Sequence, residues 1–136
     1  MGARRTIRLE DYLLAVAEIC ESSGARAMTG LVADRLQVAN GTASMALQTL
    51  AQAGWVEHIP YEGVILTDVG ERRFQNVLRR QRLIERFLLQ TVGEHGLEAA
   101  HRQAREIESV VSEELIGLIE RFLRNSIQDA ENEPQV

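Results

Sequence analysis

Residues 29–66 constrain the fold of this 136-residue chain more than any other stretch. A short helix is expected from Thr29 to Leu36, because the Thr29 hydroxyl can accept a bond from the free amides of a first helical turn. Residues 37–40 then make a tight connection, and a second helix is expected over residues 41–53. The pattern predicts two short helices packed against each other through a tight turn.

Two strand-like runs follow these helices. Gly54 suits the left-handed conformation that ends many helices. Residues 55–59 and 64–66 are rich in strand-forming side chains, and the turn-forming residues 60–63 separate them. Two helices followed by a hairpin are typical of a winged helix-turn-helix, in which the second helix enters the major groove of DNA.

The outer face of the second expected helix carries uncharged polar side chains. Thr, Ser and Gln can bond to phosphates and base edges, and Met45 can touch a thymine methyl group. The first amides of the helix, near Gly41, can hold a phosphate. Arg4 and Arg5 either touch phosphate or form a solvated basic end. The candidate DNA contacts are Arg4, Arg5, Thr29, Asn40, Gly41, Thr42, Ser44, Met45, Gln48 and Tyr61.

The charge of the chain opposes simple phosphate binding. The net charge is −5, and residues 1–66 contain five Arg against seven Asp and Glu. The expected recognition helix has no Arg or Lys. The distribution of charges over the surface nevertheless matters more for DNA binding than the net charge. An alternative interpretation is therefore a winged-helix module that binds protein and no longer binds DNA.

Composition excludes several other classes. No apolar run is long enough to cross a membrane, and no signal peptide opens the chain. The single cysteine, Cys20, fits a reducing cytoplasm, either as a small buried hydrophobe or as a redox sensor. No Gly-rich phosphate loop, nucleophile–base set or pair of acids is recognisable, so we expect a cytoplasmic protein that is not an enzyme.

The sequence predicts helices for most of the remaining residues. Residues 9–22 form an amphipathic first helix, and Thr67 caps a long helix over residues 68–92. Two more helices are expected, over residues 97–111 and from Ser112 onward. Their apolar stripes would stay partly uncovered in a monomer, which predicts a symmetric dimer through these helices. We therefore expect a mainly α protein with a winged helix-turn-helix domain at residues 1–66, a helical dimerisation domain at 67–124 and a disordered acidic tail at 125–136.

Several segments together resemble the diphtheria toxin repressor family. They are EDYL at residues 10–13, VADRL at 32–36, GTAS at 41–44, GWVEHIPYEGVILTDVGE at 54–71 and LRRQRLIERFL at 78–88. The chain is most similar to the shorter, manganese-responsive branch. The resemblance implies a homodimeric, metal-activated repressor of metal-uptake genes.

The resemblance also implies a metal site, and here the sequence departs from it. The family's ligand helix reads His-x-x-Ala-(Cys or Glu)-x-x-Glu-His, and residues 101–109 read HRQAREIES. Arg105 and Ser109 replace two ligands, and Gln81 and Leu14 replace two more on other helices. The matching residues are Asp11, Glu85, His101 and Glu108. Iron or manganese binds several carboxylates and imidazoles with no cation among them, so the sequence predicts weakened or lost metal dependence.

Arg105 suggests a replacement for the ion. His101, Arg105 and Glu108 share a helix face by their spacing, and a guanidinium can bond to two carboxylates at once. Arg105 would then bridge Asp11 and Glu108, and the protein would need no metal cofactor. Alternatively, Arg105 pairs only with Glu108 on the helix surface, or Glu85 and His101 still bind manganese or iron.

Overall fold

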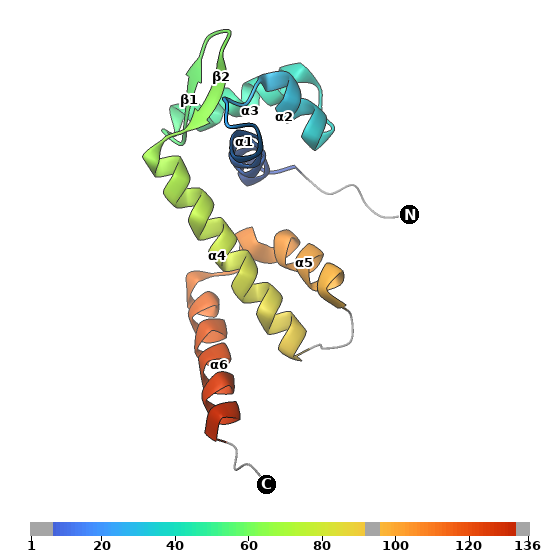
Figure 1. Cartoon of the computed structure of the whole chain (residues 1–136), viewed down its shortest axis with the longest axis vertical. Coiled ribbons are helices and arrows are strands. Elements are labelled where there is room, and N and C mark those ends of the chain that lie inside the picture. The colour runs from blue at the N-terminus through green and yellow to red at the C-terminus, as the bar shows by residue number, and fades with distance from the viewer. Residues whose placement is uncertain (1–6, 92–95, 133–136) are drawn as a thin grey trace. The chain divides into compact units, whose positions relative to one another are not determined.

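The computed structural model describes residues 7–91 and 96–132, with side chains described as far as residue 127. The described part contains six α-helices, one 3-10 turn and a two-stranded sheet (Figure 1). The chain divides into two units, residues 1–75 and 76–136. None of the described helices is long and apolar enough to span a membrane.

Three helices and a hairpin form the first unit. The helices are α1 (Leu9–Ser23), α2 (Thr29–Leu36) and α3 (Asn40–Gln52), and the hairpin consists of β1 (Val56–Ile59) and β2 (Gly63–Leu66). Figure 1 shows the helices grouped beside the hairpin. Their apolar faces share one aliphatic core, in which the largest fully buried side chains are Leu13, Val16, Val32, Leu47, Leu50 and Val64. Burying such side chains is the main stabilising term for a unit of this size.

The helix ends follow from local chemistry, with one correction. Gly24 (φ +66°) ends α1, and Gly54 (φ +81°) follows α3, both in the left-handed region where glycine carries no steric penalty. The Thr67 hydroxyl accepts the Gly70 amide at 3.1 Å, so Thr67 caps the next helix as predicted. The cap expected from Thr29 is wrong: Met28 occupies the extended position before α2, and Thr29 is already helical.

The hairpin is antiparallel and pairs Val56 with Leu66 and Ile59 with Gly63. A single bridge between Ala27 and Val64 adds the segment before α2 to the edge of β2. Tyr61 adopts a positive φ of 64° in the turn between the strands. The helix-turn-helix followed by a wing agrees with the fold predicted from residues 29–66.

The second unit is built from helices alone. It contains α4 (Asp68–Thr91) from Asn76 onward, α5 (Gly96–Ile107), a 3-10 turn η1 (Glu108–Val110) and α6 (Glu113–Asn132). Its core consists of Ile84, Ala104, Ile116, Ile119 and Leu123. Phe87 and Phe122 pack edge to face at its margin, with ring centroids 5.5 Å apart.

Two helix ends of this unit differ from the prediction. α5 ends at Ile107, where the sequence predicted continuous helix to residue 111, and Glu108 begins a 3-10 turn. The tail predicted as disordered from Asn125 is helical as far as Asn132. Ser112 does cap α6, because its hydroxyl accepts the Leu115 amide at 3.1 Å. Helix propagation adds a hydrogen bond for each residue, and residues 125–132 contain no Gly or Pro to interrupt it.

Candidate nucleic-acid interface and metal-ligand positions

The exposed face of α3 carries the residues predicted to contact DNA. Ala43, Leu47 and Leu50 point into the core, so the opposite side of the helix remains free for a ligand. Met45 is 70% exposed on that side. The other exposed candidates there are Asn40, Gly41, Thr42 and Gln48, whereas Ser44 is half-buried. The structure therefore brings these predicted α3 residues together on one helix.

Two further predicted contacts lie elsewhere in the first unit, and two cannot be placed. Tyr61 is 99% exposed at the tip of the hairpin. Its left-handed backbone is uncommon for a bulky residue, and such strain clusters at functional positions. Thr29 is half-buried at the start of α2. Arg4 and Arg5 lie outside the described residues.

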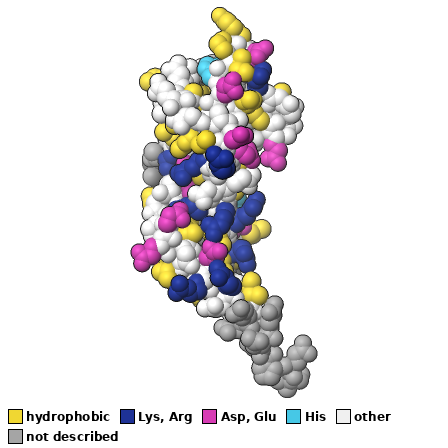
Figure 2. All heavy atoms as spheres, turned by 90° about the vertical axis from the view of Figure 1, so that its left-hand side faces the viewer, with side chains coloured by type: hydrophobic (Ala, Val, Ile, Leu, Met, Phe, Trp, Pro, Cys, Tyr) yellow, Lys and Arg dark blue, Asp and Glu magenta, His cyan; other side chains and the backbone are white. Residues whose placement is uncertain are grey.

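Two arginines of the first unit pair with carboxylates. The Arg26 Nη1 atom donates to Glu62 Oε2 at 2.7 Å, and the Arg35 Nη1 atom donates to Glu18 Oε2 at 2.9 Å. On the face drawn in Figure 2, most basic side chains belong to the part of the chain after the hairpin. The described winged unit therefore presents mainly neutral hydrogen-bonding groups and helix amides to a duplex.

An ion pair that the sequence did not reveal joins α4 to η1. The buried Arg80 guanidinium donates through Nε to Glu108 Oε1 at 3.0 Å and through Nη2 to the Glu108 carbonyl at 2.7 Å. It also donates to the Val111 carbonyl and to Glu113. Arg80 therefore fixes the turn between α5 and α6. The sequence carried one signal that Arg80 is buried. Arg80 lies three residues after Val77 and four residues before Ile84, so it shares their buried helix face.

The residues matched to metal ligands have several different environments. Asp11 is buried in the first unit, where its Oδ2 atom accepts the Arg8 amide at 2.8 Å and helps to start α1. In the second unit the Glu85 Oε2 atom lies 3.0 Å from His101 Nδ1. Glu108 is held by Arg80.

Among the described residues, no group of three or more His, Cys, Asp or Glu side chains comes together as a candidate ion site. Gln81 is buried on α4, and Arg105 is half-buried in the last turn of α5. The predicted bridge from Arg105 to Asp11 joins residues of the two units and stays a prediction.

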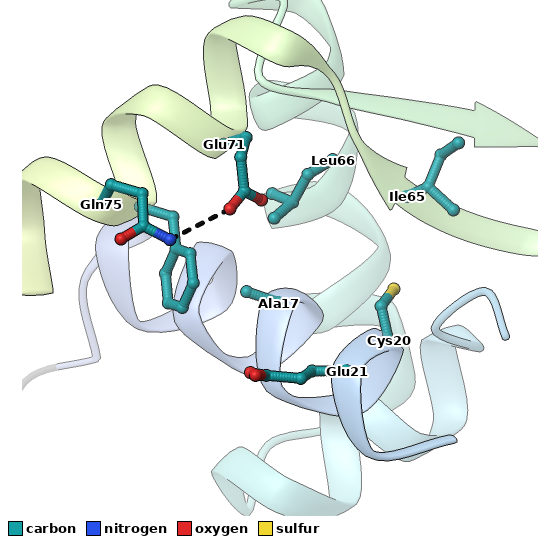
Figure 3. Close-up of a pocket in the computed structure, with 8 residues that line it drawn as sticks. Ala17, Cys20, Glu21, Ile65, Leu66, Glu71 and Gln75 are labelled. Carbon is teal, nitrogen blue, oxygen red and sulfur yellow. Dashed lines mark hydrogen bonds between the residues drawn. The ribbon is translucent and has the colours of Figure 1, made fainter. Parts of the chain in front are cut away.

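A cleft opens beside α1 within the first unit (Figure 3). Its volume is ≈ 460 Å³, and Glu21, Glu71 and Gln75 place polar groups around an apolar wall. Cys20 borders the cleft, and burial raises the pKa of its thiol. A raised thiol pKa favours the neutral, unreactive form, which agrees with the prediction of a small hydrophobe.

A helix-turn-helix with an exposed polar recognition helix and a hairpin wing, followed by a helical unit, defines a winged-helix transcriptional regulator. Two family models together cover most of the chain and meet between the hairpin and α4. Residues 6–64 match the iron dependent repressor N-terminal DNA binding domain, and residues 67–136 match the iron dependent repressor metal binding and dimerisation domain. The chain belongs to the iron-dependent repressor family, whose members are homodimeric DNA-binding regulators and not enzymes.

Relatives and solved structures agree with this assignment. The transcriptional regulator MntR of Escherichia coli is 33% identical over 88% of this chain and 76% of its own length. MntR of Salmonella typhimurium is 31% identical over 95% of this chain and 80% of its own length. A manganese-dependent transcriptional repressor solved with manganese is 32% identical, with a TM-score of 0.73 over 85% of this chain and 52% of its own.

Proposed function

We propose that this protein is a cytoplasmic, homodimeric repressor that binds its operator without a divalent metal ion. The exposed polar face of α3 supports the DNA-binding part of the proposal. Thr42, Met45 and Gln48 can read base edges and thymine methyl groups, and Tyr61 extends from the wing. The remaining candidates supply phosphate contacts that set the position of the protein on the duplex.

The ion pair between Glu108 and Arg80 is the observation that supports operator binding without a metal ion. This carboxylate is buried and matches a family ligand, and its Oε1 atom already accepts a bond from Arg80, whose guanidinium also pairs with Glu113. A buried carboxylate that lacks a cation is strongly destabilising, but Glu108 has one without any ion.

The residues present do not fit a manganese or iron site. Gln81, Arg105 and Ser109 stand at ligand positions of the family, and a guanidinium repels a divalent cation. Asp11 meanwhile caps α1 through the Arg8 amide. Glu85 and His101 remain as a two-residue pair that supplies fewer donors than these ions require.

Two measurements test the proposal separately. In EDTA, a gel shift with the protein's own promoter should show binding that weakens steeply with salt, because phosphate contacts release counterions. No shift at any salt concentration would instead favour the protein-binding module. Equilibrium dialysis against manganese and against ferrous iron should leave less than one ion bound per chain. A full equivalent bound at micromolar metal would contradict the loss of the site.

A further inference from the structure

Arg26 and Glu62 form an ion pair between the segment before α2 and the turn of the wing. The 2.7 Å bond from Arg26 Nη1 to Glu62 Oε2 joins the segment before α2 to the turn of the hairpin. Glu62 directly follows Tyr61, the most exposed large side chain of the wing. The pair therefore lies beside a residue that the proposed function places against DNA.

The backbone holds these two side chains near each other. The Ala27 amide donates to the Val64 carbonyl at 2.8 Å, and the Val64 amide donates to the Ala27 carbonyl at 2.9 Å. The two segments approach so closely that a Cβ atom on Gly63 would lie 2.7 Å from the Ala27 oxygen. Exposed ion pairs are usually weak because ordering two side chains costs entropy. Here the backbone bridge has already brought the two segments together, which lowers that cost.

The arrangement is part of a pattern in the first unit. Each arginine described between residues 7 and 66 lies within 4.0 Å of a carboxylate, as the pairs Arg8–Asp11, Arg26–Glu62 and Arg35–Glu18 show. The recognition helix itself contains no cation. A duplex that approaches this unit therefore meets arginines that already have an anionic partner.

We propose that Glu62 limits the affinity of the DNA interface by competing with a DNA phosphate for Arg26. The inference rests on the proposed function. An arginine that stays with Glu62 neutralises no phosphate and releases no counterion, so both the sequence-independent affinity and its salt dependence fall. Sequence discrimination then depends mainly on the uncharged side chains of α3, because phosphate contacts carry no sequence information.

Fluorescence anisotropy with the full chain tests this competition. Wild type, Glu62→Gln, Arg26→Gln and the double variant are titrated onto promoter DNA and onto a scrambled duplex, from about 50 to 200 mM salt. We expect Glu62→Gln to bind both duplexes about two- to fivefold more tightly, the range of an exposed ion pair. Its slope of log K against log salt should steepen by about 0.9, the value for one added phosphate. Arg26→Gln alone should change little, and the double variant should lose the gain.

Glu57→Gln is the matched control, because Glu57 is exposed on β1 and takes no part in the ion pairs of the described residues. This variant removes the same charge from the same wing. An equal gain in Glu57→Gln, or a gain that survives in the double variant, would indicate general repulsion and overturn the inference. Unchanged binding by Glu62→Gln would also overturn it and leave the proposed function standing. Failure of the wild type to bind either duplex would instead refute the proposed function.

Discussion

Arg80 and Glu108 form a buried ion pair in which Nε donates to Oε1 at 3.0 Å. The same guanidinium bonds to the carbonyls of Glu108 and Val111, where the chain passes from η1 to α6. Such a group of bonds satisfies a charge and two main-chain oxygens at once. The pair therefore fixes the turn between α5 and α6, and Glu108 is one of the residues that the sequence resemblance matched to a metal ligand.

Replacing Arg80 should destabilise the protein strongly. Arg80→Gln would remove the guanidinium that pairs with the buried Glu108 carboxylate, and breaking such a pair costs about 3–5 kcal/mol. The free energy of unfolding from urea titration measures this cost. Arg79→Gln is the control, because Arg79 pairs with Glu120 on the surface and should lose about 1 kcal/mol at most. Equal losses in both variants would show that the buried pair is energetically unimportant.

Two helical glycines should respond in opposite ways to alanine. A Cβ atom on Gly70 would lie 1.8 Å from the Trp55 carbonyl oxygen, so Gly70→Ala must displace α4 or the backbone before β1. Apart from its chain neighbours and the backbone of α6, no described atom lies within 4 Å of a Cβ atom on Gly117, and Gly117→Ala should stabilise α6 by about 0.5–1 kcal/mol. Thermal unfolding of both variants checks the prediction. A stabilised Gly70→Ala variant would contradict the close packing seen here.

Met45 should act through thymine methyl groups. Met45→Ala should keep the stability of the wild type, because the side chain is 70% exposed. Its affinity for the operator should fall by about fivefold, since an apolar contact to a methyl group is lost. An operator in which uracil replaces thymine provides the control. The wild type should bind the uracil operator more weakly than the thymine operator, whereas Met45→Ala should bind both operators alike. An equal loss of affinity on uracil DNA in both proteins would refute the contact between Met45 and a thymine methyl group.

Cys20 should be a poorly reactive thiol in the folded protein. Burial raises its pKa, which favours the neutral form, although a backbone hydrogen bond from Ala27 partly offsets the shift. Alkylation by iodoacetamide at about pH 8 should therefore be slower than in the urea-unfolded chain. Above about pH 8.5 the Cys20 thiol ionises in the unfolded chain before it ionises in the folded protein. The free energy of unfolding should therefore fall as the pH rises through this range. Equal alkylation rates in the two states would contradict the shift.

Local signals explain why the DNA-binding unit could be predicted from the sequence. The expected helix bounds of Thr29 and Leu36 match α2, and Gly54 and Thr67 mark helix ends where predicted. Each is a short-range effect of backbone freedom or a hydroxyl cap. The polar residues Thr42 and Gln48, predicted for the outer face of the recognition helix, are exposed on α3.

Long-range effects explain what the sequence did not reveal. Arg80 stands in the run Arg79–Arg80–Gln81–Arg82 and resembles a solvated charge, yet it is buried because partners from η1 and α6 surround it. The pairing of Arg26 with Glu62 likewise depends on a bridge between segments 36 residues apart. Neither partner is set by local propensity or spacing, so these contacts require the tertiary structure.

We propose that operator binding by this protein needs no divalent metal. Fluorescence anisotropy of the purified wild type on its own promoter DNA tests it, first in EDTA and then with added manganese or ferrous iron. We predict tight binding in EDTA that either metal leaves unchanged. Binding that appears only after metal is added would rule out metal-independent binding and show that Asp11, Glu85, His101 and Glu108 still form a working site.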